Sequence, residues 1–527
     1  MSGPGPAHAM DRLKRPQITI LVIGLAVRLA LMPWFNLELD LGYWVRITGL
    51  LDAGFTLYDT VGYYYTPIWG YVVGLSSFIG GLLGVTDLAT FVPELTPYVS
   101  GVYFLSEYVV SPAYSVTVKL PIILADTVTA FLLYDLVKDI TDDRRKAVFA
   151  FALWYLCPFV ILISSVHGMF DSISAMLILL TISFVHKRRY ILGGVSFSLA
   201  VLTKFFPVFF VFFLIAYVLK REGLDRNGVK HLLSAFIAAV VTLFAVQFPA
   251  LLRGQFWESM FFLTDRVGLS TDLAKTIFSP KVIPIILLAL AIVCIAIHLI
   301  RRRKGAAIAE YVRSLDPKVR DRYFIRGLIA IGIILTISVM IYTMVSIMGE
   351  TDSTVHDILV ALGMKGVMIL SLYTILLEIY LAYRVLVADE LTDRLVFRTL
   401  MLSSIVIFLW PGLPQYLVVI VPFLVAYAAI VDEGFTRPFM VFSLVIALYE
   451  VLILNGSIFF TLAVYTDLVP LSLPLTITDW MVTPILGMPL FGFLMGVFVI
   501  FEYLAMLGMF LHWYCNRGSD ARRIGYQ

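Results

Sequence analysis

The chain has 527 residues, of which 60% are hydrophobic and only 14% are charged, against about 25% charged residues in ordinary soluble domains. A soluble protein could not hide that much apolar side chain from water. The composition therefore excludes a soluble enzyme, a disordered chain and a fibrous repeat, and it predicts a protein that crosses a membrane many times. The net charge of +3 is too small to indicate a nucleic-acid partner.

Apolar runs long enough to cross a bilayer as helices, which takes about 20 residues, follow one another along the chain. In order they are 18–34, 117–137, 147–166, 232–252, 281–300, 327–349, 357–383, 440–465 and 484–512. Four further runs are interrupted by proline or by a charge: 66–84, 171–185, 191–219 and 400–430. The first run lacks a small-residue cleavage site, so we expect it to be retained as a span. The pattern predicts an all-α polytopic membrane protein with about 11–14 transmembrane helices.

The basic residues indicate the orientation of these spans, because Lys and Arg collect in cytoplasmic loops. Thirty of the 39 stand in eight clusters: Arg12 to Arg15, Lys138 to Lys146, Lys187 to Arg189, Lys220 to Lys230, Arg301 to Arg326, Arg384 to Arg398, Arg437, and Arg517 to Arg523. All eight clusters can lie on the cytoplasmic side only under two conditions. The run 191–219 must be a helical hairpin that turns outside near 203–207. The run 400–430 must likewise turn outside near 411–414. Proline at both places and glycine at the second favour such turns. The N- and C-termini are then cytoplasmic.

Residues 35–116 form a long outer loop in this scheme, because the chain leaves the membrane after the first span and re-enters near residue 117. The loop carries seven acidic residues and one basic residue, Arg46. We expect 66–84 to be a juxtamembrane or re-entrant helix within it; an extra pair of spans is the alternative. The chain, 1–527, is then a single integral membrane domain, in which 117–430 completes the main module and 431–527 supplies C-terminal helices.

Two carboxylates, Glu38 and Asp40, directly follow the first span. A carboxylate at the membrane surface is partly desolvated, which raises its basicity, so it could take a proton from a hydroxyl group. The alternative is an ordinary acidic loop. Farther along, the stretch Tyr63-Tyr64-Tyr65-Thr66-Pro67 offers rings that could stack on a sugar or contact lipid. Its alternative is an aromatic belt with proline opening a helix.

Polar residues between later apolar runs form further candidate sites. His167 and Asp171 stand four residues apart; they could line a polar pocket, or form an interhelical turn with a capping Asp. Lys204 lies inside an apolar run, where a charge is a functional hypothesis by default. It could bind a lipid phosphate, or it could form a structural ion pair with Asp126.

Gln415 and Tyr416, beside the second expected turn, offer hydrogen bonds to a ligand, although this stretch could also be a simple break between spans. The chain contains no P-loop, G-x-G-x-x-G, H-E-x-x-H or Ser–His–Asp pattern. The absence of these motifs argues against a nucleotide-hydrolysing pump.

Taken in order, these segments resemble the GT-C superfamily of membrane glycosyltransferases, which use polyprenyl- or dolichyl-phosphate sugars as donors. Within it they resemble the catalytic subunit of the first GPI mannosyltransferase and its prokaryotic relatives. The motifs that carry the resemblance are Glu38-Leu39-Asp40; Tyr63-Tyr64-Tyr65-Thr66-Pro67; Lys119-Leu120, Asp126 and Leu132-Leu133-Tyr134; Leu153 to Pro158, Ser164-Ser165 and Gly168 to Ser172; Ala200, Lys204 and Pro207; and Gln415-Tyr416 with Pro422. The chain departs from the family at Glu38, where the family has Asp, and at His167, where it tends to have Arg.

The resemblance implies an inverting hexosyltransferase at the outer membrane face, with mannose as the expected sugar. Asp40 would be the general base, with Glu38 as the second catalytic carboxylate. The implied substrate-binding residues are Arg46, Tyr65, His167, Asp171, Lys204, Gln415 and Tyr416. The implied partners are a polyprenyl- or dolichyl-phosphate sugar, a lipid or glycan acceptor and membrane lipids, without nucleic acid. No cofactor is obligatory, although Glu38 and Asp40 could hold a divalent metal. The membrane would be the cell membrane, or the endoplasmic reticulum in a eukaryote.

A transporter or flippase of a lipid-linked or small polar substrate is the alternative, because charges within apolar runs also suit a transport pathway. These charged residues are Arg28, Lys119, Asp126, Lys204, Lys365 and Glu378. Transporters usually have paired broken helices in two related halves, and the halves of this chain show no similarity. A third alternative is a non-catalytic subunit that binds a polyprenyl lipid.

Overall fold

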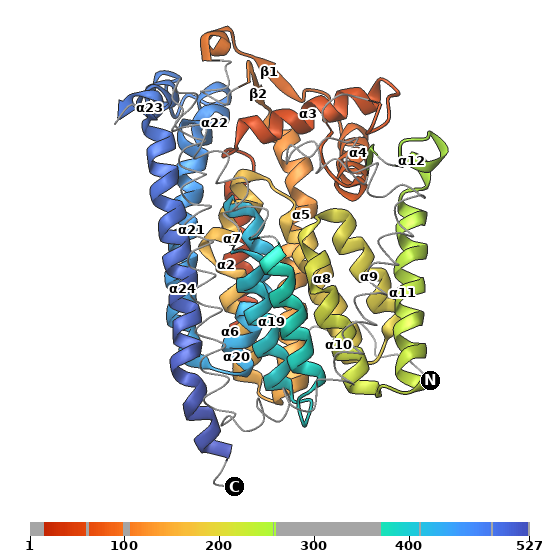
Figure 1. The fold of residues 1–527 in the computed structure, drawn as a ribbon. Helices are drawn as coiled ribbons and strands as arrows, with labels where there is room; N and C mark the ends of the chain where they lie inside the picture. The colour runs from red at the N-terminus through yellow and green to blue at the C-terminus, as the bar shows by residue number, and fades with distance from the viewer. Residues whose placement is uncertain are drawn as a thin grey trace, which may run out of the picture.

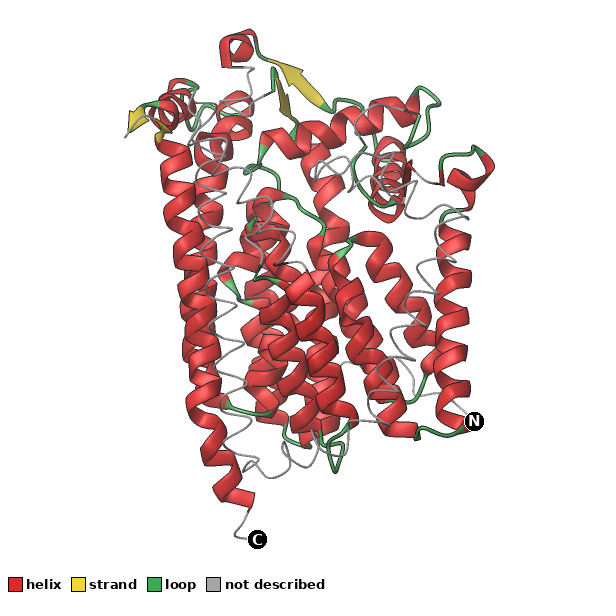
Figure 2. Cartoon of the chain, in the orientation of Figure 1, coloured by secondary structure: helices red, strands yellow, loops and turns green. Residues whose placement is uncertain are grey.

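The computed structural model describes residues 15–59, 63–98, 106–256, 258–259, 370, 372–409, 413–485 and 488–524, and side chains up to residue 516. Within these residues the chain is a bundle of long helices with a layer of short elements across one end (Figure 1). Strands occur only as two short hairpins in the described ranges (Figure 2). The predicted all-α polytopic fold is confirmed.

The first half of the described chain supplies the centre of the bundle. Its helices are α2 (Arg15–Leu31), α5 (Pro112–Thr141), α6 (Arg144–Tyr155), α7 (Pro158–Ile161), the π-helix η2 (Leu162–His167), α8 (Asp171–His186), α9 (Tyr190–Thr203), η3 (Phe206–Phe210), α10 (Val211–Glu222), α11 (Arg226–Val246) and α12 (Phe248–Leu252). Helix α8 packs against both α5 and α9, and α9 packs against α11.

The second half closes the bundle on another side. After a helix over 372–386 come α19 (Asp393–Ile407), η4 (Pro414–Ile420), α20 (Val421–Ile430), η5 (Glu433–Phe435), α21 (Thr436–Leu454), η6 (Asn455–Phe459), α22 (Phe460–Tyr465), α23 (Ser472–Val482) and α24 (Leu490–Ile524). Helix α20 is buried along its whole length among α5, α6 and α19. Helices α21 and α24 run side by side at one edge (Figure 1).

The layer across one end is built from α3 (Glu38–Asp52), α4 (Pro67–Leu82), η1 (Pro93–Tyr98) and the antiparallel strands β1 (Ala89–Phe91) and β2 (Tyr108–Val110). We call this end of the bundle the α3 end. The turn between α10 and α11 and the last turns of α24 lie at the opposite end (Figure 1). The second hairpin pairs β3 (Pro484–Ile485) with β4 (Met488–Pro489).

Local sequence sets several helix starts. Ser111 accepts a hydrogen bond from the Tyr114 amide, and Pro112 occupies the first turn of α5, where its missing N–H costs nothing. Asp143 caps α6, Asp225 caps α11 and Thr392 caps α19 in the same manner. These caps explain why the helices begin where they do.

Four described helices are long and apolar enough to span a membrane, or five if the bent pair of α6 with α7–η2 forms one span. They are Pro112–Thr141, Arg226–Val246, Glu433–Tyr465 and Leu490–Asn516. The expected spans 281–300 and 327–349, and residues 357–369 of a third, lie outside the described residues. The exposed side chains of α11 include Val229, Leu233, Phe236, Ile237 and Val241, as expected for a helix that faces lipid.

The two interrupted runs that were expected to turn, 191–219 and 400–430, break near the predicted places. Helix α9 ends at Thr203 and η3 begins at Phe206, so Lys204 stands in the turn between them. Helix α19 ends at Ile407 and η4 begins at Pro414; residues 410–412 lie outside the described part. Helix α4 has 16 residues, fewer than a span needs, and it lies beside α3 in the layer at the α3 end (Figure 1).

Candidate active site

A buried histidine connects two carboxylates that are far apart in the sequence. His167 Nε2 lies 2.6 Å from Asp40 Oδ2, and His167 Nδ1 lies 2.6 Å from Glu450 Oε1. Asp40 is in the first turn of α3, His167 ends η2, and Glu450 belongs to α21. The side chains of His167 and Glu450 are 1% and 0% exposed, whereas that of Asp40 is 25% exposed. Only the Asp40 end of this chain of hydrogen bonds can therefore meet a substrate.

The turn after His167 is built to bring these segments close together. Gly168 has a φ of 84°, a left-handed conformation that glycine adopts without strain. A Cβ atom there would come within 2.5 Å of the Leu41 side chain and 2.9 Å of that of Lys119. Lys119 in turn donates to the carbonyl of Val166 (2.9 Å) and to Asn36 Oδ1 (2.6 Å). Lys119 thus joins α5 to both the chain before α3 and the turn that carries His167.

Lys204 is held by an acid and three aromatic rings. Its Nζ lies 3.1 Å from Asp171 Oδ2. The ring centroids of Phe170, Tyr416 and Tyr65 lie 4.4, 4.8 and 5.3 Å from the same atom, within the range of cation–π attraction. We call Lys204, Asp171 and these rings the lysine box. It brings together four of the predicted site residues, and Asp171 is only four positions from His167.

Asp126 is not the partner of Lys204. It accepts from Arg28 Nε at 2.9 Å, with both side chains fully buried, so the predicted alternative of a Lys204–Asp126 ion pair is wrong. Arg28 also donates to the carbonyl of Tyr155. A buried arginine needs several acceptors to replace water. Asp126 of α5 and the carbonyl of Tyr155 in α6 are two of the acceptors of Arg28.

Three buried oxygen atoms, one in the lysine box and two in residues next to it in the sequence, have no hydrogen-bond partner among the described residues. They are Asp171 Oδ1, Ser172 Oγ and Gln415 Oε1. Leaving a buried polar group unpaired costs about 1–3 kcal/mol. Such atoms are therefore suited to hydrogen bonds with a polar ligand.

Glu38 points away from Asp40, because residues two positions apart on a helix face opposite sides. Its carboxyl oxygens accept from the amide of Val110 (2.9 Å) and the hydroxyl of Thr461 (2.6 Å), and its own amide donates to Ser457 Oγ. Burial raises the pKa of the Glu38 carboxyl to about 7, although these hydrogen bonds partly oppose the shift. The contacts of Glu38 therefore join α3 to β2 and α22.

Arg46 is exposed on α3, six residues beyond Asp40 and on a different face of the helix. No group of three or more His, Cys, Asp or Glu side chains is placed to hold a metal ion within the described ranges. The two carboxylates expected to share a metal, Glu38 and Asp40, belong to separate hydrogen-bond networks. They do not fit that role in this arrangement.

Comparison with known proteins supports the family resemblance. Residues 109–247 match the family described as "Dolichyl-phosphate-mannose-protein mannosyltransferase". The chain is also 28% identical over 127 residues to "GPI mannosyltransferase 1" of Saccharomyces cerevisiae. That alignment covers 24% of this chain and 31% of the yeast protein, so the chain matches about a third of its relative's length. The similarity to GT-C-type mannosyltransferases is confirmed.

The matched mannosyltransferase segment contains His167, Asp171 and Lys204, whereas Asp40, Gln415 and Tyr416 lie outside it. The structure nevertheless brings Asp40 to His167, and Tyr416 to Lys204. The geometry therefore joins residues of the matched segment to residues that lie outside it.

Sequence reasoning missed Glu450 and Phe170 as members of this site. Glu450 is the single acidic residue between 440 and 465, and an acid within an apolar span is itself a functional signal. Phe170 carried no such signal, because an apolar ring beside a turn is ordinary. Its stacking on Trp69 and its contact with Lys204 are visible only in three dimensions.

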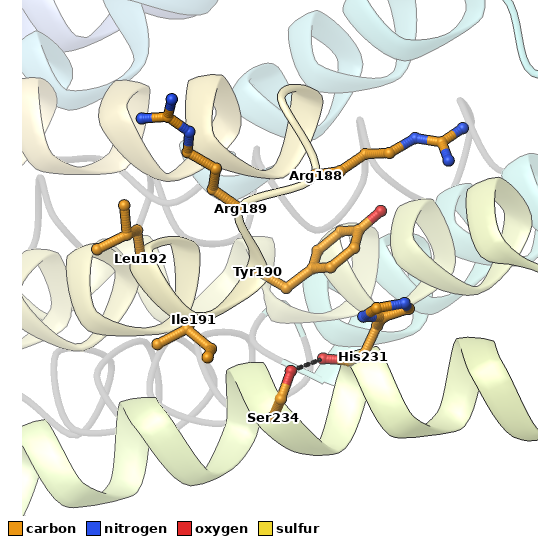
Figure 3. A pocket seen from close by; sticks show the side chains of 7 residues that line it. All are labelled: Arg188, Arg189, Tyr190, Ile191, Leu192, His231 and Ser234. Atoms are coloured by element: carbon orange, nitrogen blue, oxygen red, sulfur yellow. Dashed lines mark hydrogen bonds between the residues drawn. The ribbon is translucent and has the colours of Figure 1, made fainter. Parts of the chain in front are cut away.

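A separate pocket of about 300 Å³ lies away from this site, where the α8–α9 turn meets α11. It is lined by Arg188, Arg189, Tyr190, Ile191, Leu192, His231 and Ser234 (Figure 3). The side chains of Arg188 and Arg189 point in different directions (Figure 3). Their guanidinium groups thus do not converge on one anion.

Proposed function

We propose that the protein is an inverting glycosyltransferase that moves a hexose, with mannose the expected sugar, from a polyprenyl- or dolichyl-phosphate donor to a hydroxyl group of a lipid or glycan acceptor. The observation that carries the proposal is the partly exposed Asp40 carboxylate, held by a 2.6 Å hydrogen bond to the buried His167. The match of residues 109–247 to a mannosyltransferase family supports it. The proposed site faces the outer side of the membrane.

The proposed chemistry is a single displacement. Asp40 Oδ1 removes the proton of the acceptor hydroxyl as its oxygen bonds to the anomeric carbon. The bond from that carbon to the donor phosphate breaks, and the phosphate leaves with the electron pair. Because attack and departure occur on opposite faces of the sugar, the configuration at the anomeric carbon is inverted. General-base catalysis of this kind contributes about 10²–10⁴-fold in rate.

The lysine box is suited to the sugar phosphate. The rings of Tyr65 and Tyr416 give aromatic faces for stacking, and the Lys204 ammonium can share its charge between Asp171 and a leaving phosphate. Asp171 Oδ1 and Gln415 Oε1 are free to accept from sugar hydroxyls within the described structure. We assign Glu38 no part in this step, because its carboxyl oxygens already accept from the amide of Val110 and the hydroxyl of Thr461.

The transport alternative rested on buried charges, and the structure gives several of them structural partners. Arg28 pairs with Asp126, and Lys119 is bound to three backbone carbonyls and Asn36. These contacts hold helices together. The burial of these charges in α2 and α5 is therefore explained by structural contacts, and a transport pathway is not required to explain it.

The test is transfer of radiolabelled mannose from a synthetic polyprenyl-phosphate mannose to a membrane-lipid extract, with chromatography of the products. We expect labelled lipid with the wild-type protein. Asp40→Asn keeps the size of the side chain and should lower transfer at least about a hundredfold, the low end for a general base. Asp87→Asn, an exposed acid at the same end, is the matched control and should transfer normally. Near-normal transfer by Asp40→Asn would remove Asp40 from the proposed role.

A further inference from the structure

The Asp40–His167–Glu450 arrangement depends on the charge of the imidazole. Each ring nitrogen lies 2.6 Å from a carboxylate oxygen, slightly closer than the about 2.7–2.9 Å of charge-assisted N–H···O hydrogen bonds. A neutral imidazole has a single N–H and could donate to only one of the two carboxylates, whereas an imidazolium donates to both. The geometry therefore favours an imidazolium between two carboxylates.

Glu450 has the position of the third member of such a relay. Its side chain is fully buried in α21, and its Oε2 has no hydrogen-bond partner among the described residues. Its hydrogen bond to His167 is thus the contact that compensates its burial. An isolated carboxylate in this position would be costly, so the carboxylate and the imidazolium stabilise each other.

We propose that Glu450 is a positioning residue for the sugar transfer: through His167, it holds Asp40 as an ionised and correctly oriented base. This inference rests on the proposed function, which supplies the reaction. Nε2–H occupies Asp40 Oδ2 and leaves Oδ1 for the acceptor hydroxyl. Glu450 itself, buried behind the ring, touches no substrate.

The proton balance of the relay is simple. Before transfer the three groups hold a net charge of −1, from two carboxylates and one imidazolium. The acceptor O–H bond breaks, its proton binds to Asp40 Oδ1, and the three groups become neutral overall. The departing phosphate carries the electron pair of the broken sugar–oxygen bond. Asp40 then releases its proton to water, since its side chain is 25% exposed whereas those of the other two are not.

Other charged groups face the same turn and set the background for any pH dependence. Lys119 of α5 donates to the carbonyl of Val166, next to His167. Asp171 begins α8, and Lys204 pairs with it from the turn after α9. None of the three forms a hydrogen bond with the imidazole, so the two carboxylates bear directly on its protonation.

The first test compares the pH–rate profiles of wild type and Glu450→Gln. Gln keeps an oxygen to accept from Nδ1–H but removes the negative charge, so the imidazolium should lose its proton more easily. We expect kcat to fall at least about tenfold, the donor KM to change little, and the alkaline limb of the profile to move to lower pH. Glu450→Asp restores the charge and should recover much of the rate and of the limb.

Glu502→Gln provides the matched control, because Glu502 is also a fully buried carboxylate on α24, the helix that packs against α21. It lies outside the relay and should leave the pH profile in place. If Glu450 had a purely structural role, Glu450→Gln would lower the thermal stability and the amount of active protein without moving the alkaline limb of the pH–rate profile. That outcome, or a normal profile in Glu450→Gln, would overturn the inference.

The second readout does not depend on transfer. In protein labelled with 15N-histidine, the resonance that is absent in His167→Gln identifies the ring. We expect it to report an imidazolium in wild type at a pH where an ordinary histidine, with a pKa of about 6.5, is neutral, and a neutral ring in Glu450→Gln. A neutral ring in wild type would refute the relay, whereas a charged ring in a protein without any transfer would refute only the proposed function.

Discussion

At the scale of single residues, the Lys204–Asp171 pair raises the question of whether Lys204 serves stability or chemistry. Lys204→Gln leaves the Asp171 carboxylate buried without its cation. Removing one partner of a buried ion pair typically costs about 3–5 kcal/mol. We expect thermal unfolding at a clearly lower temperature, and recovery of much of the loss in Lys204→Gln/Asp171→Asn, because the two residues are directly coupled.

Sugar transfer by that double variant separates the two roles. If Lys204 stabilises the leaving phosphate, the protein will be stable again but will still transfer slowly. The corresponding change at the other buried pair, Arg28→Gln/Asp126→Asn, is the control and should alter stability without a specific loss of transfer. A stable Lys204→Gln/Asp171→Asn protein with normal transfer would take Lys204 out of the site.

The sequence singled out many residues of the candidate site, but it did not show which of them contact one another. The polar residues Asp40, His167, Asp171 and Lys204 stood out because charges are rare in apolar surroundings. Their partners could not be deduced, because the sequence does not show that the first turn of α3 meets the end of η2 or that Asp126 faces α2. Glu38 and Asp40 looked like one pair in the sequence, and only the helical geometry of α3 separates them.

At the scale of elements, Glu38 fixes α3 to β2 and α22, and this attachment should depend on pH. The pKa of Glu38 is about 7 in the folded protein against an ordinary value of 4.5. Because the folded pKa is raised, the unfolded chain ionises first, and stability falls as the pH rises from about 4.5 to about 7. The contribution is on the order of 3 kcal/mol, since one pKa unit corresponds to about 1.4 kcal/mol.

Glu38→Gln tests this prediction, because an amide imitates the protonated carboxyl. Its nitrogen can donate to Thr461 and its oxygen can accept from the amide of Val110. Thermal unfolding measured across this pH range should show a smaller slope in Glu38→Gln and a more stable protein above pH 7. Glu94→Gln changes an exposed acid of the same layer and should keep the wild-type slope. An unchanged slope in Glu38→Gln would contradict the assignment.

The ends of helices could be predicted from the sequence where a proline or a capping residue sets them. The breaks before η3 and η4 were predictable because Pro207 and Pro414 cannot continue the preceding helix. The expected span 147–166 looked continuous, yet α6 ends at Tyr155 and the chain bends by 48° before α7 and η2. Pro158 marks the break, but the π-helix that follows depends on contacts with α5 and α21, which the sequence does not show.

At the scale of the whole molecule, the acidic loop and the basic clusters lie at different ends. The layer of α3, α4 and β1–β2 holds Asp40, whereas basic residues flank the turn between α10 and α11 at the opposite end (Figure 1). Positive charge is retained on the cytoplasmic side during insertion. This arrangement supports the proposal that the transfer takes place at the outer face, where a lipid-phosphate sugar would have to be presented.

Labelling with a membrane-impermeant maleimide decides this orientation. Asp87→Cys places a thiol on an exposed site of the α3 end, and Arg145→Cys places one at the start of α6, in a basic cluster. Both are made in a Cys515→Ser background, because Cys515 is exposed. In intact cells we expect Asp87→Cys to react and Arg145→Cys to react only after permeabilisation. The reverse pattern would place Asp40 on the cytoplasmic side, and the donor would then have to be one that faces the cytoplasm.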